Sequence, residues 1–196
     1  MASAAADPSD AAEAARVEKI WEWWRGSLQS PKKVLAPMVD QSELPFRMLT
    51  RKHGADICYT PMIHARLYSE RDEAHCEKMF NTEPLDRPLF AQFCGNEPEV
   101  LLKAALKLQD RCDAVDLNLG CPQGIARKGR YGAYLLEEQE TVLEIVRTLS
   151  AGLKVPVSVK IRLLGDREAT VDYARRIVAA GASVLTVHGR TKEEKG

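Results

Sequence analysis

The stretch DLNLGCPQGIARKGRYGA, residues 116–133, places a cysteine between a glycine and a proline at the end of an apolar run. A basic loop with several glycines follows it. Cys121 in this position is compatible with four roles: a packed core residue, a metal ligand, a nucleophile or an acid. Because each role implies a different protein, the surroundings of this stretch decide between folds and functions.

Short apolar runs alternate with helical patterns along most of the chain. The runs that we interpret as strands are VLAPM (34–38), ICYTPM (57–62), PLFAQF (88–93), AVDLNL (114–119), VPVSVKI (155–161) and SVLTVHG (183–189). Apolar stripes at helical spacing lie between several of them, at residues 100–108, 142–149 and 171–178. This alternation predicts parallel strands that are joined by right-handed crossovers.

Proline and glycine residues mark the expected ends of the helices. Pro98 suits a first helical turn, because proline lacks the N–H that is unpaired there anyway. Gly54, Gly152 and Gly181 follow helical segments, where we expect left-handed caps.

Polar side chains choose between an open sheet and a barrel. Three strands each carry polar residues on one face: Asp116 with Asn118; Ser158, Lys160 and Arg162; Thr186, His188 and Arg190. Gln92 ends another run, and no GxGxxG follows the first strand. Polar residues that converge from the carboxyl ends of many strands are typical of a TIM barrel. We therefore predict an α/β fold, a (β/α)8 TIM barrel that is incomplete here, with about six βα units.

The chain divides into three expected parts. These are a disordered N-terminus (1–15), a helix with its linker (16–33) and a partial TIM-barrel domain (34–196). Val17, Ile20, Trp21 and Trp24 fall at helical spacing. We expect this face to pack against the domain rather than to stack on bases. With six units of eight, we also expect the chain to be truncated.

Composition excludes several classes of protein. Hydrophobic residues make up 45% and charged residues 29%, as in ordinary globular proteins, and no apolar run is long enough to span a membrane. Lys+Arg and Asp+Glu balance at 28 each, so no overall positive field indicates nucleic acid. The five cysteines form no CxxC pair, which favours reduced thiols without metal or disulfides. We expect a cytoplasmic protein that could also be nuclear.

Lys160 and Cys121 are the candidates for chemistry. Lys160, inside an apolar run, would pair with Asp116, form a Schiff base, or hold an anionic cofactor. Cys121 lacks partners at metal-ligand spacing, and its nearest histidine by strand order, His188, is two strands away. A thiol with an ordinary pKa of about 8.5 keeps its proton at neutral pH and can act as an acid. An inert, packed cysteine also remains open.

Other polar residues are candidates for binding. Asn118 and Gln92 offer amide donors and acceptors to the edge of a planar heterocycle. His188 followed by Arg190 suits a phosphate or an electron-rich ring. The loop with Arg127, Lys128 and Arg130 is either solvated or a mobile contact to substrate phosphate.

Five segments together resemble one known family. They are APMVDQSELPFR (36–47), AQFCGNEP (91–98), DLNLGCPQGIARKGRYGAYLL (116–136), VKIRL (159–163) and TVHGRT (186–191). The chain from about residue 34 to residue 196 resembles the tRNA-dihydrouridine synthases, and is most similar to eukaryotic members that act on positions 16 and 17 of the D-loop. The resemblance implies an FMN enzyme on a TIM barrel that reduces uridine in tRNA with NADPH or NADH.

The resemblance also implies roles for individual residues. Cofactor contacts are expected from Pro37, Met38, Val39, Gln92, Lys160 and His188. Cys121 is expected to give a proton to uracil C5 while hydride from the flavin reaches C6. Substrate contacts are expected from Asn118, Arg127, Lys128 and Arg130. The enzyme is expected to be a monomer that uses no metal and no membrane.

Two parts of the family pattern are missing. Family members hold the FMN phosphate after strands seven and eight and grip tRNA with a C-terminal helical domain. We therefore expect this chain alone to bind FMN weakly and tRNA hardly at all. Two alternatives remain: a non-catalytic truncated form, and a Schiff-base barrel aldolase that uses Lys160.

Overall fold

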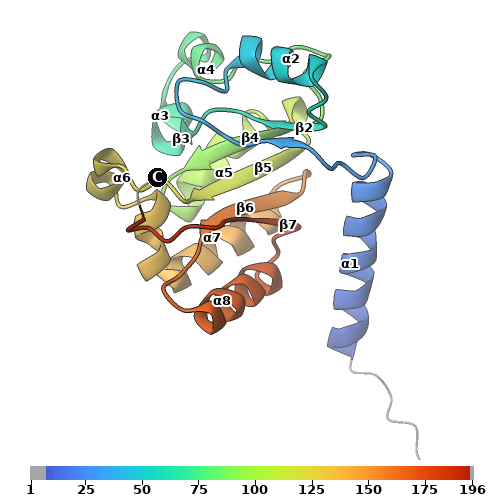
Figure 1. The fold of residues 1–196 in the computed structure, drawn as a ribbon, viewed down its shortest axis with the longest axis vertical. Helices are drawn as coiled ribbons and strands as arrows, with labels where there is room; N and C mark the ends of the chain where they lie inside the picture. Colours follow the sequence, from blue (N-terminus) through green and yellow to red (C-terminus); the bar gives the residue numbers. More distant parts are fainter. Residues whose placement is uncertain (1–7, 195–196) are drawn as a thin grey trace, which may run out of the picture.

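A computed structural model describes residues 8–194 of the chain (Figure 1). The strands are β1 (Val34–Leu35), β2 (Ile57–Tyr59), β3 (Ile63–His64), β4 (Leu89–Cys94), β5 (Ala114–Leu119), β6 (Val157–Arg162) and β7 (Val184–His188). The α-helices are α1 (Pro8–Arg25), α2 (Leu44–Lys52), α3 (Ala65–Glu70), α4 (Glu73–Met79), α5 (Pro98–Leu106), α6 (Gly124–Gly129), α7 (Gln139–Gly152) and α8 (Arg167–Ala179). Two 3-10 helices are η1 (Gln109–Arg111) and η2 (Gly132–Glu137).

The strands form one parallel sheet in the order β1-β2-β4-β5-β6-β7, with β3 paired to β4. The sheet curves into a half-barrel, and helices α2 to α5, α7 and α8 surround it (Figure 1). All six expected strands are present, and the short β3 is an addition. The predicted fold class, an incomplete TIM barrel, is confirmed.

Strand β5 shows why the sheet has an apolar outer face and a polar inner face. Val115, Leu117 and Leu119 are fully buried in the main core, together with apolar residues of α5 and α7. Burial of each such side chain stabilises the fold by about 1.5–3 kcal/mol. Successive residues of a strand point to opposite faces, so Asp116 and Asn118 point to the inside.

The register lines up these inner residues in rows across the strands. Asp116 lies opposite Gln92 of β4 and Ser158 of β6. One row closer to the carboxyl ends, Asn118 lies opposite Lys160. Because all strands are parallel, the last rows reach the same end of the half-barrel.

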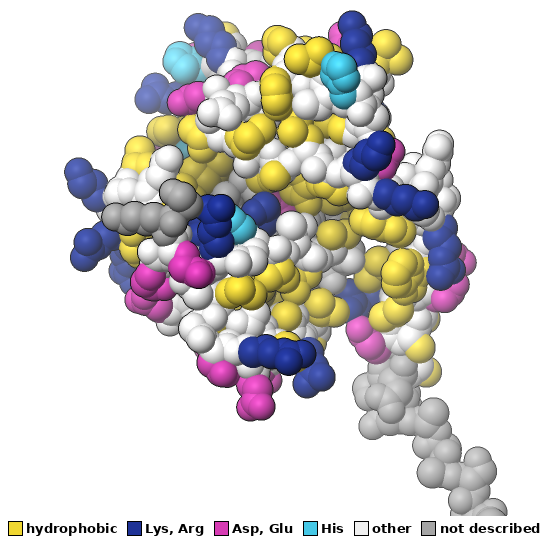
Figure 2. Space-filling model, in the orientation of Figure 1, with side chains coloured by type: hydrophobic (Ala, Val, Ile, Leu, Met, Phe, Trp, Pro, Cys, Tyr) yellow, Lys and Arg dark blue, Asp and Glu magenta, His cyan; other side chains and the backbone are white. Residues whose placement is uncertain are grey.

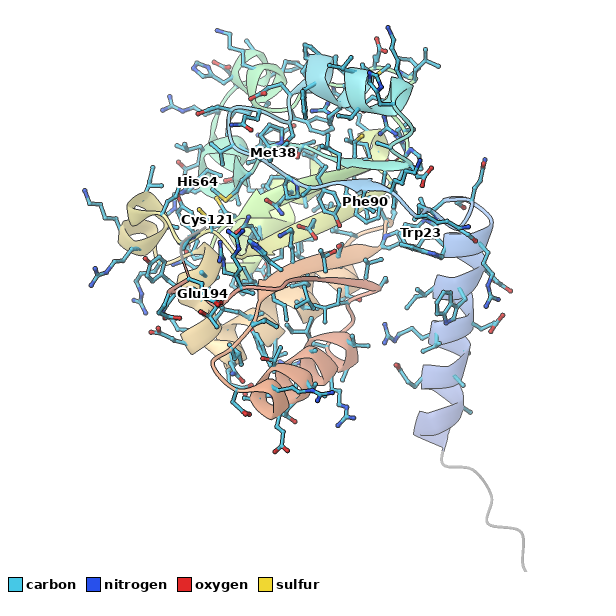
Figure 3. The ribbon with its side chains drawn as sticks, viewed as in Figure 1. Trp23, Met38, His64, Phe90, Cys121 and Glu194 are labelled. Atoms are coloured by element: carbon cyan, nitrogen blue, oxygen red, sulfur yellow. The ribbon has the colours of Figure 1, made fainter. Side chains whose placement is uncertain are left out.

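Helix α1 differs from the expectation in two ways. It begins at Pro8, so the part of the expected disordered N-terminus from residue 8 to 15 is helical, whereas residues 1–7 lie outside the described part. The packing face is different in part: Trp24 packs against the domain as expected, but Val17 and Trp21 are exposed, and Trp23 stacks on Phe90 (Figure 3). The reason is that the apolar contacts of α1 with the barrel come from its last turn, while the middle of the helix contacts the domain through Arg16.

Two local predictions after the fifth helix were wrong. The expected loop after Cys121 contains α6, because Ala126 is buried against the core and Arg130 closes the helix in a left-handed conformation (φ 50°). Gly152 is no left-handed cap but ends α7 where a side chain would strike Leu102: an added Cβ would lie 2.6 Å from Leu102 Cδ1. Gly54 and Gly181 do adopt positive φ. None of the described helices is long and apolar enough to cross a membrane.

Candidate active site

A cavity of about 500 Å³ opens at the carboxyl ends of the strands. It is lined by Ala36, Pro37, Val39, Met62, Gln92, Asn118, Gly120, Cys121, Pro122, Lys160, Arg162, Thr186, Val187, His188 and Gly189. These residues come from six strands or the turns that follow them. The volume lies within the range of about 300–1,000 Å³ that is usual for ligand and cofactor sites.

Seven of the residues predicted from the sequence line this cavity: Pro37, Val39, Gln92, Asn118, Cys121, Lys160 and His188. Met38 does not line it, because its N–H donates to Ser42 Oγ at 3.0 Å and its carbonyl accepts from the Ser42 hydroxyl. Met38 thus closes a turn that presents its two neighbours.

The three predicted basic residues lie elsewhere. Arg127 and Arg130 line neither this cavity nor the one beside it, and Arg130 forms an ion pair with Glu138 at 2.7 Å. Lys128 lines the neighbouring cavity. The basic segment therefore flanks the candidate active site instead of covering it. Cys121 itself lies between α6 and the sheet (Figure 3).

A chain of three side chains crosses the inner face of the sheet. Gln92 Nε2 donates to the buried Asp116 Oδ2 at 2.7 Å, and Gln92 Oε1 accepts from Asn118 Nδ2 at 2.7 Å. The remaining oxygen, Asn118 Oδ1, accepts from the backbone N–H groups of Gly120 and Cys121 at 3.1 and 2.9 Å. The position of the cysteine backbone is thus tied to a carboxylate deep in the barrel.

The segment after α6 folds back over the same turn. The N–H of Ala133 donates to the Cys121 carbonyl at 3.0 Å. Gly132 has a φ of 64°, and an added Cβ would lie only 2.7 Å from that carbonyl oxygen. Only glycine combines this backbone conformation with so close an approach. Cys121 is therefore held from both sides, with its side chain at the cavity.

Lys160 lies inside the barrel without an anionic partner. With the described residues it forms no hydrogen bond or ion pair, although it lines the cavity. The register places it opposite Asn118, so the pair with Asp116, one of the three alternatives for Lys160, is not formed. Burial lowers the pKa of Lys160, while the charge of Asp116 partly opposes this shift. A free ammonium group here fits an anionic or electron-rich ligand.

The wall beside Lys160 carries two more nitrogen-containing side chains, those of His188 and Arg162. Burial, and then the charges of Arg162 and Lys160, lower the pKa of His188. Arg162 was not among the predicted site residues, yet it lines the cavity and is only 8% exposed. Its Nε donates to the Gly120 carbonyl at 2.6 Å and its Nη1 to the Thr191 carbonyl at 2.8 Å. Its place two residues after Lys160, on the same face of a strand, was the signal for it.

The donor set fits a planar heterocycle better than a metal ion. Pro37, Val39 and Met62 supply apolar contacts, while two amides and a free ammonium supply donors and acceptors. Within residues 8–194 there is no group of three or more His, Cys, Asp or Glu side chains that could hold a metal. The residues therefore fit the ring of a flavin.

Comparisons with known proteins agree with this geometry. The family model described as dihydrouridine synthase matches residues 34–196. The chain is 54% identical over 168 residues to a tRNA-dihydrouridine(16/17) synthase of Schizosaccharomyces pombe. The aligned region covers 85% of this chain and 42% of the relative. The chain is 50% identical over 177 residues to a rat protein named as tRNA-dihydrouridine(16/17) synthase-like, covering 90% and 40%. A mouse tRNA-dihydrouridine(20a/20b) synthase-like protein is 42% identical over 166 residues. The chain thus spans about two fifths of the length of the two tRNA-dihydrouridine(16/17) synthase relatives.

Proposed function

The chain belongs to the dihydrouridine synthase family, and we propose that it carries the cofactor- and uracil-binding core of an enzyme that reduces uridine to 5,6-dihydrouridine in tRNA. We further propose positions 16 and 17 of the D-loop as targets, since the relatives with 50–54% identity are named for them. One observation carries the proposal. Cys121, Lys160 and the Gln92–Asn118 amide pair line a single cavity at the carboxyl ends of the strands.

FMN is the cofactor that we propose, with NADPH or NADH as the reductant. When bound, reduced FMN supplies the hydride that adds to C6 of the uracil. In this chain Lys160 and Gln92 would hold the polar edge of the ring, and Pro37 and Val39 would contact its face. His188 lies on the neighbouring strand β7, opposite Arg162, and lines the same cavity. A fixed positive charge beside the ring favours a cofactor that carries negative charge.

Cys121 is the proton donor in this proposal. Its thiol gives its proton to C5 of the uracil, so that one proton and one hydride are added across the C5–C6 double bond. The side-chain amide oxygen of Asn118 accepts from the N–H of this cysteine and fixes its backbone, and Gly132 packs against it. The uridine has to leave its stack to reach the cavity, at a cost of a few kcal/mol.

The direct test is Cys121→Ala in the expressed protein, assayed on tRNA that lacks dihydrouridine, with FMN and NADPH supplied. General acid catalysis contributes about 10²- to 10⁴-fold, so we expect the rate to fall by at least about 100-fold while FMN binding is retained. Cys112→Ala is the matched control. Cys112 is buried just before the amino end of β5, whereas Cys121 follows its carboxyl end.

Three outcomes separate the proposal from its rivals. Full activity of Cys121→Ala would refute the acid role. Absence of dihydrouridine with the unaltered protein would favour a non-catalytic form. A substrate trapped on Lys160 by borohydride, without flavin, would favour the Schiff-base aldolase, for which the family match gives no support.

A further inference from the structure

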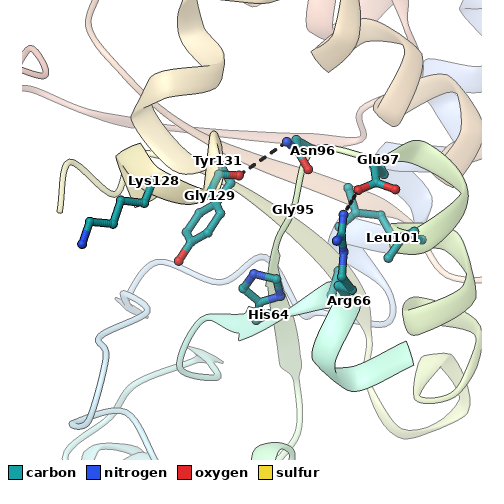
Figure 4. A pocket seen from close by; sticks show the side chains of 11 residues that line it. His64, Arg66, Gly95, Asn96, Glu97, Leu101, Lys128, Gly129 and Tyr131 are labelled. Carbon is teal, nitrogen blue, oxygen red and sulfur yellow. Dashed lines mark hydrogen bonds and ion pairs between the residues drawn. The ribbon is translucent and has the colours of Figure 1, made fainter. Parts of the chain in front are cut away.

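A second cavity of about 300 Å³ lies beside the candidate active site and shares no lining residue with it (Figure 4). We call it the flanking pocket. Three segments supply most of its lining: His64 to Arg66 at the start of α3, Gly95 to Glu97 before α5, and Lys128, Gly129 and Tyr131 at the end of α6 and just after it. Asn96 Nδ2 donates to the Gly129 carbonyl at 3.4 Å and so joins two of these walls.

The flanking pocket and the active-site cavity are neighbours through one short segment. Tyr131 lines the flanking pocket, and the next residue, Gly132, packs against the Cys121 carbonyl. A polymer that places one unit at Cys121 therefore has its next unit near the flanking pocket.

The floor of the flanking pocket is aromatic. The rings of His64 and Tyr131 meet edge to face, with centroids 5.4 Å apart and an interplanar angle of 90°. Within the described part of the chain, the buried His64 Nδ1 has no hydrogen-bond partner. Aromatic faces bind nucleobases by stacking, and the half-buried His64 ring offers a face for this, whereas Tyr131 behind it is only 4% exposed.

The rim of the flanking pocket is basic. Lys128 is exposed and forms no ion pair with any residue from 8 to 194, while Arg66 is paired with Glu97 at the opposite wall (Figure 4). Figure 2 shows Lys and Arg side chains that project from the surface over α6. Lys128 is thus a cation available to a phosphate next to an aromatic floor, the combination with which proteins hold single-stranded RNA.

We propose that the flanking pocket binds the nucleotide next to the reacting uridine in the same RNA strand. Its base lies against His64, whose ring packs edge to face on the buried Tyr131, and its phosphate meets Lys128. This inference rests on the proposed function and deepens it: a strand held at two consecutive nucleotides is aligned for reduction at one of them. The pocket then contributes to RNA affinity and to the choice of position, without a part in the reduction itself.

The test uses His64→Ala and Lys128→Ala in the FMN-loaded protein, with unmodified tRNA as substrate. We expect His64→Ala to raise KM by about 5- to 100-fold, as for the loss of one base contact, with little change in kcat. We expect Lys128→Ala to raise KM and to reduce the salt dependence of binding by about one phosphate contact. His75→Ala and Lys154→Ala are the matched controls, because both side chains are exposed and lie outside both cavities.

A second readout does not depend on catalysis. A tRNA transcript with 4-thiouridine beside the target uridine is irradiated with the protein, and the cross-linked peptides are mapped. Cross-links to segment 64–66 or 128–131 support the inference, even if no dihydrouridine forms and the proposed function fails. Normal reduction with unchanged KM in both variants and cross-links only elsewhere would overturn it while leaving the proposed function intact. If His64→Ala does not fold, Lys128→Ala and the cross-links still decide.

Discussion

Asp116 determines the direction of the hydrogen bonds that end at Cys121. An ionised carboxylate only accepts, so the amide nitrogen of Gln92 must face it and the amide oxygen must face Asn118. Asn118 then has to donate its own nitrogen, which leaves its oxygen for the N–H groups of the Gly-Cys turn. One buried charge thus fixes the orientation of the Gln92 and Asn118 side-chain amides. The residue types alone would allow either amide to be rotated by 180°.

The charge of Asp116 makes stability depend on pH. Burial raises the pKa of Asp116 to about 6, although bonds from Gln92 and Ser158 and the charge of Lys160 lower it. Since the ordinary value is about 3.9, the folded protein binds this proton more tightly than the unfolded chain does. The resulting stability is present below about pH 4 and is lost as pH rises through about 6.

We therefore expect Asp116→Asn to remove this pH dependence. Two pKa units correspond to roughly 3 kcal/mol. Between pH 4 and pH 7, the free energy of unfolding of the unaltered protein should therefore fall by about this amount, and that of the variant should not show this loss. Urea unfolding at a series of pH values measures it. Parallel curves for the two proteins would contradict the assigned burial cost.

The turn and short helix after β5 act as one element that holds Cys121. Gly132 sits at positive φ with its Cα against the Cys121 carbonyl, and η2 starts there. Gly132→Ala is expected to lower stability by about 1–3 kcal/mol and to slow the proposed reduction, because either the backbone or the cysteine has to move. Gly124→Ala is the control, since a Cβ there meets nothing within 4 Å. Thermal unfolding and the tRNA assay measure both, and equal behaviour of the two variants would refute the close approach.

Helix α2 depends on a buried ion pair. Arg47 and Asp86 are both almost fully buried, with Arg47 Nη2 and Asp86 Oδ2 2.7 Å apart, and Arg51 Nε lies 3.1 Å from Asp86 Oδ1. Removal of one partner leaves an uncompensated charge in the interior. We expect Asp86→Asn to lower the free energy of unfolding by about 3–5 kcal/mol in urea titrations.

An exposed ion pair provides the comparison for this prediction. Glu144 pairs with Arg147 on α7 at 3.2 Å, and both side chains are more than half exposed. Glu144→Gln should cost less than about 1 kcal/mol, because solvent screens such pairs. An Asp86→Asn variant as mildly affected as Glu144→Gln would show that the interior pair is not needed for the fold.

At the scale of the whole molecule, the last turn of α1 covers the amino-terminal end of the half-barrel. Trp23 stacks on Phe90 with ring centroids 6.1 Å apart, and Leu28 joins the same small core. Arg16 reaches the other side of the sheet, where its Nη2 donates to the Val178 carbonyl at 3.1 Å. The helix therefore contacts both β4 and α8, and Figure 1 shows its upper end beside the half-barrel.

Two tryptophans on this helix allow a matched test. Trp23→Ala should lower the free energy of unfolding by about 1–3 kcal/mol, through lost burial and stacking. Trp21 is 46% exposed and contacts Arg25. Trp21→Ala should therefore change the free energy of unfolding by less than about 0.5–1 kcal/mol. Both variants are unfolded in denaturant, and unfolding is monitored by far-UV circular dichroism, a signal that does not depend on tryptophan fluorescence. A larger loss for Trp21 would mean that α1 packs by its other face.

The sequence alone determined the alternation of strands and helices and the end of the barrel that carries the polar residues. Periodicity is a local property, and parallel strands bring their carboxyl ends to one edge wherever the helices pack. For this reason Cys121, Lys160 and Gln92 could be assigned to one site before the fold was known. Family resemblance, rather than pattern, then proposed the chemistry.

Only the tertiary structure decided which of these residues meet. Lys160 lies opposite Asn118, whereas Asp116 lies opposite Ser158. The register between β5 and β6 decides this pairing, and the sequence does not show that register. Lys128 lines a different cavity from Cys121, because α6 turns the basic segment away. Which face of α1 packs was likewise set by where its last turn meets the barrel. Contacts of this kind depend on distances between segments far apart in sequence, which no local spacing contains.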